Sequence, residues 1–98
     1  MAMKAPEKLL PRKKLEEVKR CVEAVFPEAI FIEVSRGPGK GALLSFVLPI
    51  GRFSVDDDFL KKIIILMRLI RKRVKMGIEF IGMLPNPKGS YAVSFIIK

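Results

Sequence analysis

Hydrophobic residues recur every three or four positions from Asp56 to Met76, a period typical of an amphipathic helix. Ser54 or Asp56 can cap its start, and Gly77 is expected to end it. Acidic residues at the start and basic residues at the end both suit the helix dipole. The stretch therefore predicts a long helix, whose buried stripe is formed by Phe59, Ile63, Leu66, Met67, Ile70 and Val74.

An earlier stretch has the same period, with Pro11 suited to the first helical position. Its stripe is formed by Leu15, Val18, Val22 and Val25. Phe26 precedes Pro27, and the residue before a proline disfavours the helical conformation. We therefore predict a second helix that ends at Phe26.

Four β-branched and aromatic runs predict strands, each bounded by glycine or proline turns. They are Ala29 to Ser35, Ala42 to Leu48, Gly77 to Met83 and Ser90 to Ile97. The short turns favour antiparallel hairpins, and two helices can cover only one face of the sheet. The predicted fold is α+β, a two-layer sandwich in the order α-β-β-α-β-β, as one domain over residues 1–98 with residues 1–10 as a flexible arm.

The second half of the chain repeats the order of the first at an offset of about 49 residues. At that offset Phe31 aligns with Phe80, Pro38 with Pro87 and Phe46 with Phe95, among other pairs. Strand pairs and proline-containing turns also fall in the same order. This pattern suggests an internal duplication.

Strict alternation divides the strand residues between two faces of the sheet. The set assigned to the helix-covered core is Ile30, Ile32, Val34, Leu44, Phe46, Leu48, Ile81, Met83, Val93, Phe95 and Ile97. The set left for the open face includes one aromatic ring from each half, Phe31 and Phe80. Such rings can stack unpaired bases, although each can also be buried against a loop or another subunit.

The net charge of +9 favours a polyanionic partner, with nucleic acid ahead of an anionic membrane. The near absence of Asn and Gln, with many Lys, Glu and Ile, is typical of a thermophile. Cys21 is the single cysteine, there is no histidine, and the first residues lack the apolar core of a signal peptide. We therefore expect a cytoplasmic protein that does not cross a membrane.

The basic side chains form two candidate groups for phosphate binding. Arg36, Lys40 and Lys88 lie in the hairpin turns, and Arg68, Arg71 and Lys72 lie on one flank of the long helix. Ile65 and Leu69 are expected nearly opposite the buried stripe of that helix, where a monomer would expose them. They are our candidates for an oligomer interface, as a dimer or tetramer.

Candidate chemistry is otherwise sparse. Asp56, Asp57 and Asp58 can be read as a metal cluster, but helix capping explains them without a metal. The turn from Arg36 to Gly41 lacks the spacing of a phosphate-binding loop and leads into a strand. Without histidine the common catalytic triads are absent. We expect no enzyme, no metal and no cofactor.

The chain resembles the archaeal ThermoDBP-related single-stranded nucleic-acid-binding proteins. The resemblance rests on the stretches AIFIEVSRGPGKGALLSFVL, KKIIILMRLIRKRVK and GIEFIGMLPNPKGSYAVSFII. It implies a cleft with an apolar floor and basic rims, to which Phe31, Phe80, Arg36, Lys40 and Lys88 would contribute. ThermoDBP itself has an added C-terminal helical segment for dimerisation, whereas this sequence ends on a predicted strand, so an oligomer would form differently.

We expect a non-enzymatic protein that binds single-stranded DNA or RNA with low sequence specificity. One alternative is a structural subunit of a homo-oligomer, in which the open sheet face and the pair Ile65 and Leu69 are interfaces. A second alternative is an accessory protein in RNA processing or on the ribosome.

Overall fold

The computed structural model describes residues 10–37, 39, 41–49 and 56–98. These residues form two helices and four strands in the order α-β-β-α-β-β, which confirms the predicted fold. The elements are α1 (Arg12–Val25), β1 (Ile30–Arg36), β2 (Ala42–Leu48), α2 (Asp57–Arg73), β3 (Ile78–Pro85) and β4 (Tyr91–Ile97).

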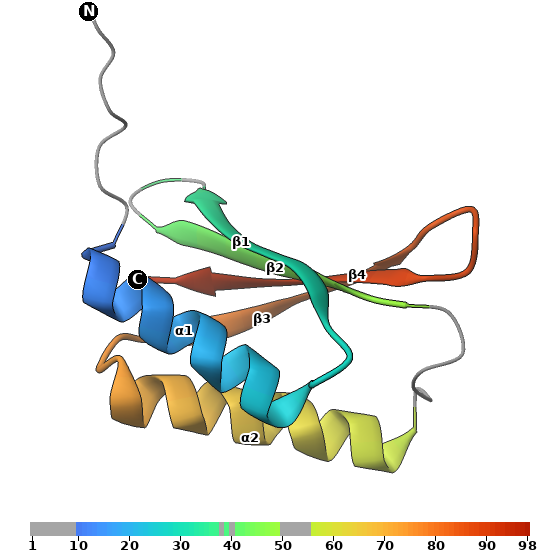
Figure 1. Ribbon diagram of the computed structural model, residues 1–98, viewed down its shortest axis with the longest axis horizontal. Helices are drawn as coiled ribbons and strands as arrows, with labels where there is room; N and C mark the ends of the chain where they lie inside the picture. Colours follow the sequence, from blue (N-terminus) through green and yellow to red (C-terminus); the bar gives the residue numbers. More distant parts are fainter. Residues whose placement is uncertain (1–9, 38, 40, 50–55) are drawn as a thin grey trace, which may run out of the picture.

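The strands pair antiparallel in the order β1-β2-β4-β3, so β1 and β3 are the edge strands. Both helices lie on the same side of this sheet (Figure 1), which makes the molecule a two-layer sandwich. One ion pair and one cation–ring contact, both described below, show that α1 and α2 run antiparallel to each other. The proposed internal duplication stays a prediction.

Capping determines where α2 begins. The side chain of Asp56 accepts a hydrogen bond of 3.1 Å from the backbone N–H of Phe59, which confirms Asp56 as the cap. At the other end, the helix finishes at Arg73, and Lys75 takes the left-handed φ of 63°. The prediction that Gly77 ends the helix is therefore wrong. Gly77 instead pairs with the backbone of Lys98, at 3.0 Å in both directions.

Helix α1 begins one residue later than predicted, because Pro11 is its N-cap. It ends at Val25, with Phe26 as the C-cap, as expected from Pro27. Val18, Cys21 and Val22 are fully buried against the sheet.

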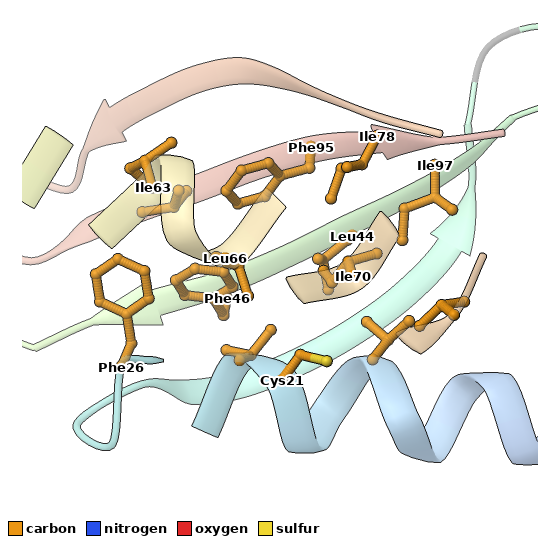
Figure 2. Packing of buried hydrophobic residues seen from close by; sticks show 14 of the residues in the cluster. Cys21, Phe26, Leu44, Phe46, Ile63, Leu66, Ile70, Ile78, Phe95 and Ile97 are labelled. Atoms are coloured by element: carbon orange, nitrogen blue, oxygen red, sulfur yellow. The ribbon is translucent and has the colours of Figure 1, made fainter. Parts of the chain in front are cut away.

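The core lies between the two helices and the sheet, and aromatic rings form much of it (Figure 2). The ring centroid of Phe46 lies 5.5 Å from that of Phe26 and 6.0 Å from that of Phe95. Leu66 and Ile70 of α2 are fully buried in the same cluster. Among the described residues, no polar or charged side chain is buried, so this core is held by apolar packing alone.

Each edge strand contains a β-bulge. In β1 the pairing register shifts between Ile30 and Glu33, and in β3 it shifts between Phe80 and Gly82. A bulge adds one residue to a strand and so changes which face the following side chains occupy. The core positions predicted for Ile30 and Ile81 are consequently wrong, since these side chains are 42% and 55% exposed.

The two central strands follow the predicted alternation. The side chains predicted for the core, Leu44, Phe46, Leu48, Val93, Phe95 and Ile97, are all buried, and Ala42 is buried with them. Ile96, which was predicted to lie on the open face, is also buried, at 8% exposure. Within the described residues, neither helix is both long enough and apolar enough to span a bilayer.

Candidate nucleic-acid interface

The face of the sheet away from the helices carries three cross-strand rows of side chains. The pairing registers place together Ser35, Leu43, Ile96 and Glu79 in the first row, Glu33, Ser45, Ser94 and Gly82 in the second, and Ile30, Val47, Ala92 and Leu84 in the third. On the two central strands the rows are small or apolar, with the serine pair Ser45 and Ser94 in the middle, and a carboxylate lies on each edge strand. The three rows contain no lysine or arginine, and Lys98 lies beside Ile96 at their end. Two carboxylates against one cation give this face, among the described residues, little attraction for a polyanion.

Phe31 is the bulged residue of β1 and takes a left-handed φ of 52°. Its side chain is 72% exposed, more than any other large hydrophobic residue described. A bulky residue rarely adopts this φ, because its Cβ approaches the backbone closely. The structure therefore presents an exposed ring on a strained backbone, as the stacking hypothesis requires of Phe31.

Phe80 lies on the other face of the sheet from the one predicted. It pairs with Phe95, a core residue, and the two ring centroids are 5.3 Å apart. Phe80 is 36% exposed at the sheet edge. The prediction that Phe31 and Phe80 share one open face is wrong, because both lie next to bulges that interrupt the alternation.

The hairpin turns do not form a common rim. Ala42 pairs with Ile97 and Leu48 pairs with Tyr91, so the turn before β2 and the turn before β4 lie at opposite ends of the sheet (Figure 1). Arg36 and Lys88, both exposed, are consequently separated by the length of the strands. Lys40 lies outside the described residues. A single cleft lined by both turns is therefore not present in the described structure.

Positive charge is concentrated in the helical layer. Helix α1 contains five lysines and arginines against three glutamates, and α2 contains six against two aspartates. Because both helices cover the same face, the cations lie on the side of the molecule opposite the open sheet face.

Three of the α2 cations are engaged by other groups. Arg73 lies 3.5 Å from Glu17 of α1, and the ammonium nitrogen of Lys62 lies 6.0 Å from the ring centre of Phe26. These two contacts identify the flank of α2 that faces α1. Arg71 donates a hydrogen bond of 3.2 Å to the carbonyl oxygen of Ile78, which places it on the opposite flank, next to β3.

The remaining three α2 cations lie on one line. Lys61, Arg68 and Lys72, with Ile65 between them, follow the spacing i, i+4, i+7, i+11 of a single helix face. We call these four residues the outer stripe. All four are exposed and lie opposite the buried face of α2. Among the described residues, none of the three cations makes an ion pair or a side-chain hydrogen bond.

The outer stripe spans about 16 Å, from a rise of about 1.5 Å per residue. Its residues were recognisable in the sequence by their spacing. The sequence-based prediction nevertheless grouped Arg71 with Arg68 and Lys72 on one basic flank. In the structure Arg71 is separated from the other two by its contact with β3.

The exposure predicted for Ile65 is confirmed, at 52%. The exposure predicted for Leu69 is wrong, since Leu69 is half-buried and packs against the core.

The remaining candidates for chemistry have structural explanations. Asp56 caps α2, and Asp57 and Asp58 occupy its first turn, where the helix dipole favours negative charge. Burial is the main cause that raises the pKa of the Cys21 thiol, and the nearby Glu17 raises it further, against the opposing effect of Arg73. Cys21 is therefore protonated near neutral pH and unsuited to act as a nucleophile. Among the described residues, no group of three or more acids or cysteines is arranged to hold a metal ion.

Comparison with known protein families, with curated proteins and with solved structures gives no match to this chain. The resemblance to the ThermoDBP-related proteins thus stays a prediction, and the functional argument rests on the arrangement of charge and apolar surface.

Proposed function

We propose that this protein is a non-enzymatic nucleic-acid-binding protein that holds a phosphate backbone on the outer stripe of α2. The observation that carries the proposal is the line formed by Lys61, Arg68 and Lys72. These cations are exposed, have no described partner, and belong to a chain with a net charge of +9. Lysine and arginine contacts to phosphate position a nucleic acid without reading its sequence.

Within this proposal, a single strand is the preferred form. The outer stripe places an apolar side chain, Ile65, between its cations, and Phe31 offers an exposed ring elsewhere on the molecule. Unpaired bases can contact such apolar groups, whereas a duplex presents mainly phosphates and sugars on its outside. A cytoplasmic location, where DNA and RNA are accessible, belongs to the same proposal.

The test is a fluorescence titration of oligo-dT over a series of salt concentrations, with oligo-U and duplex DNA for comparison. The logarithm of the affinity should fall linearly with the logarithm of the salt concentration, with a slope of about −0.7 per phosphate contact on a single strand. Replacing Lys61, Arg68 and Lys72 together by Ala should reduce the slope by about 2.

The control variant replaces Lys13, Lys19 and Lys98 by Ala. It removes the same charge from exposed positions outside the outer stripe. Its slope should change much less than that of the stripe variant. Equal losses in the two variants would show that net charge, and not the outer stripe, determines binding. An absence of binding at low salt would refute the proposed function.

A further inference from the structure

Four of the large exposed hydrophobic residues gather along one margin of the molecule. Leu60 and Ile64 lie on α2 and are 53% and 46% exposed, while Phe80 and Ile81 lie on the edge strand β3. Leu60 and Ile64 share a helix flank with Arg71, which bonds to Ile78 of β3. This is the flank that faces away from α1.

The same flank has a coiled-coil spacing. Asp57, Leu60, Ile64, Met67 and Arg71 follow one another at intervals of three, four, three and four residues, the pattern of alternating a and d positions. Its middle is apolar, its first residue is acidic and its last is basic. Two copies of this pattern are therefore complementary when their helices run antiparallel.

We infer that this flank is the contact between two copies of the chain, related by a twofold axis near Ile64, with the two α2 helices antiparallel. In this arrangement each Ile64 meets its counterpart, and Asp57 meets the partner's Arg71. Leu60 meets the exposed part of the partner's Met67, which is half-buried against the core. A twofold contact of this kind uses the same residues on both copies. It is independent of the proposed nucleic-acid binding.

Charge supports a second copy as the occupant. Two chains of net charge +9 repel each other over most of their surfaces. Antiparallel pairing of α2 brings the acidic first turn of one helix, with Asp57 and Asp58, beside the basic last turn of the other, with Arg71, Lys72 and Arg73. Parallel pairing would place like charges together at both ends.

The sheet edge is part of the same margin. Strand β3 has no neighbour on its outer side in the described sheet, and its bulge interrupts regular hydrogen bonding there. Contact at the margin therefore rests on the helix flanks and on the side chains of Phe80 and Ile81, rather than on a continuous eight-stranded sheet.

The test measures mass by sedimentation velocity over a wide range of protein concentration. The wild-type chain is expected to dimerise, and Ile64→Lys should raise the dissociation constant about a hundredfold or more, since it places a charge at the centre of the contact. Ile65→Lys is the matched control, because the neighbouring side chain has similar exposure but lies on the outer stripe. Circular dichroism should show that both variants fold, as both positions are exposed.

A second measurement checks the register. Under mild oxidation, Ile64→Cys should form an interchain disulfide much faster than Ile65→Cys, because a residue near a twofold axis meets its own copy. A monomer at every concentration, or a dimer that both lysine substitutions weaken equally, would overturn the inference. Equal rates of disulfide formation would overturn the antiparallel register.

Discussion

Phe80 stands directly across the antiparallel ladder from Phe95, with 5.3 Å between the ring centroids. The contact draws an edge-strand ring towards the core, while Phe31, at the equivalent place in the other hairpin, extends into solvent. Two phenylalanines that look alike in the sequence thus have different roles in the structure.

Replacing each ring by Ala should separate these roles. Phe80→Ala should lower the free energy of unfolding by about 1–3 kcal/mol, because it removes apolar burial and an aromatic pair. Its effect on oligo-dT affinity should be small. Phe31→Ala should leave stability within about 0.5 kcal/mol and, if the ring stacks a base, weaken oligo-dT binding by about 1–3 kcal/mol. Urea denaturation and a binding titration on both variants provide the check. Loss of binding in Phe80→Ala alone would reverse the assignment.

Arg71 and Arg68 form a second matched pair. Arg71→Ala removes the hydrogen bond to the carbonyl oxygen of Ile78 and should cost about 1 kcal/mol of stability. Arg68→Ala removes a cation that has no partner among the described residues, so it should leave stability nearly unchanged and reduce the salt slope of oligo-dT binding by about 0.7. Both measurements belong at protein concentrations too low for self-association. A larger loss of salt slope in Arg71→Ala would contradict the outer-stripe assignment.

The left-handed residue after α2 offers a gain in stability. Lys75 has a φ of 63°, which glycine adopts without strain. Lys75→Gly should therefore raise the free energy of unfolding by about 1 kcal/mol. Lys75→Ala is the control, because it removes the same charge and keeps the unfavourable φ. Thermal denaturation of the two variants should show a higher melting temperature for the glycine variant only.

The buried thiol predicts how stability depends on pH. Burial and Glu17 raise the pKa of Cys21 above its ordinary value of 9.0. Below that value the thiol is protonated in both states, and its contribution to stability is complete. Above it the unfolded chain ionises first, so the free energy of unfolding falls by up to about 1.4 kcal/mol per pH unit until the folded thiol also ionises.

Cys21→Ala provides the control for this pH dependence. The variant loses some packing at every pH but should show a shallower decline as the pH rises above about 9. Parallel stability curves for wild type and variant would show that Cys21 does not contribute, and that the decline comes from other groups.

The order of helices and strands could be predicted because each follows from local periodicity and turn residues. Alternation also identified the core-facing residues predicted for β2 and β4, since central strands that pair on both sides are regular here, but it did not predict that Ile96 is buried on the open face. It failed in β1 and β3, where one extra residue in each strand changed the face of Ile30 and of Phe80. Gly82 was a signal for the second bulge, because an isolated glycine within a strand often marks one. We find no comparable signal at Phe31.

The candidate site was predicted less well than the fold. A common rim of both hairpin turns would form if β2 lay antiparallel beside β3, whereas β2 pairs with β4 and the two turns lie at opposite ends. Local sequence does not determine which hairpin strands become neighbours. The cationic flank of α2 was predictable from spacing alone, but the contact that removes Arg71 from it depends on where β3 lies.

The unequal distribution of charge between the helical layer and the sheet gives the molecule an electric dipole. Among the described residues, the helices carry a positive excess, whereas the open sheet face carries two carboxylates, Glu33 and Glu79, against one cation, Lys98, at its end. This dipole is perpendicular to the sheet, so the field of a polyanion orients the protein before contact. The helical layer is therefore expected to reach the polyanion first. Added salt should therefore slow association more than it speeds dissociation.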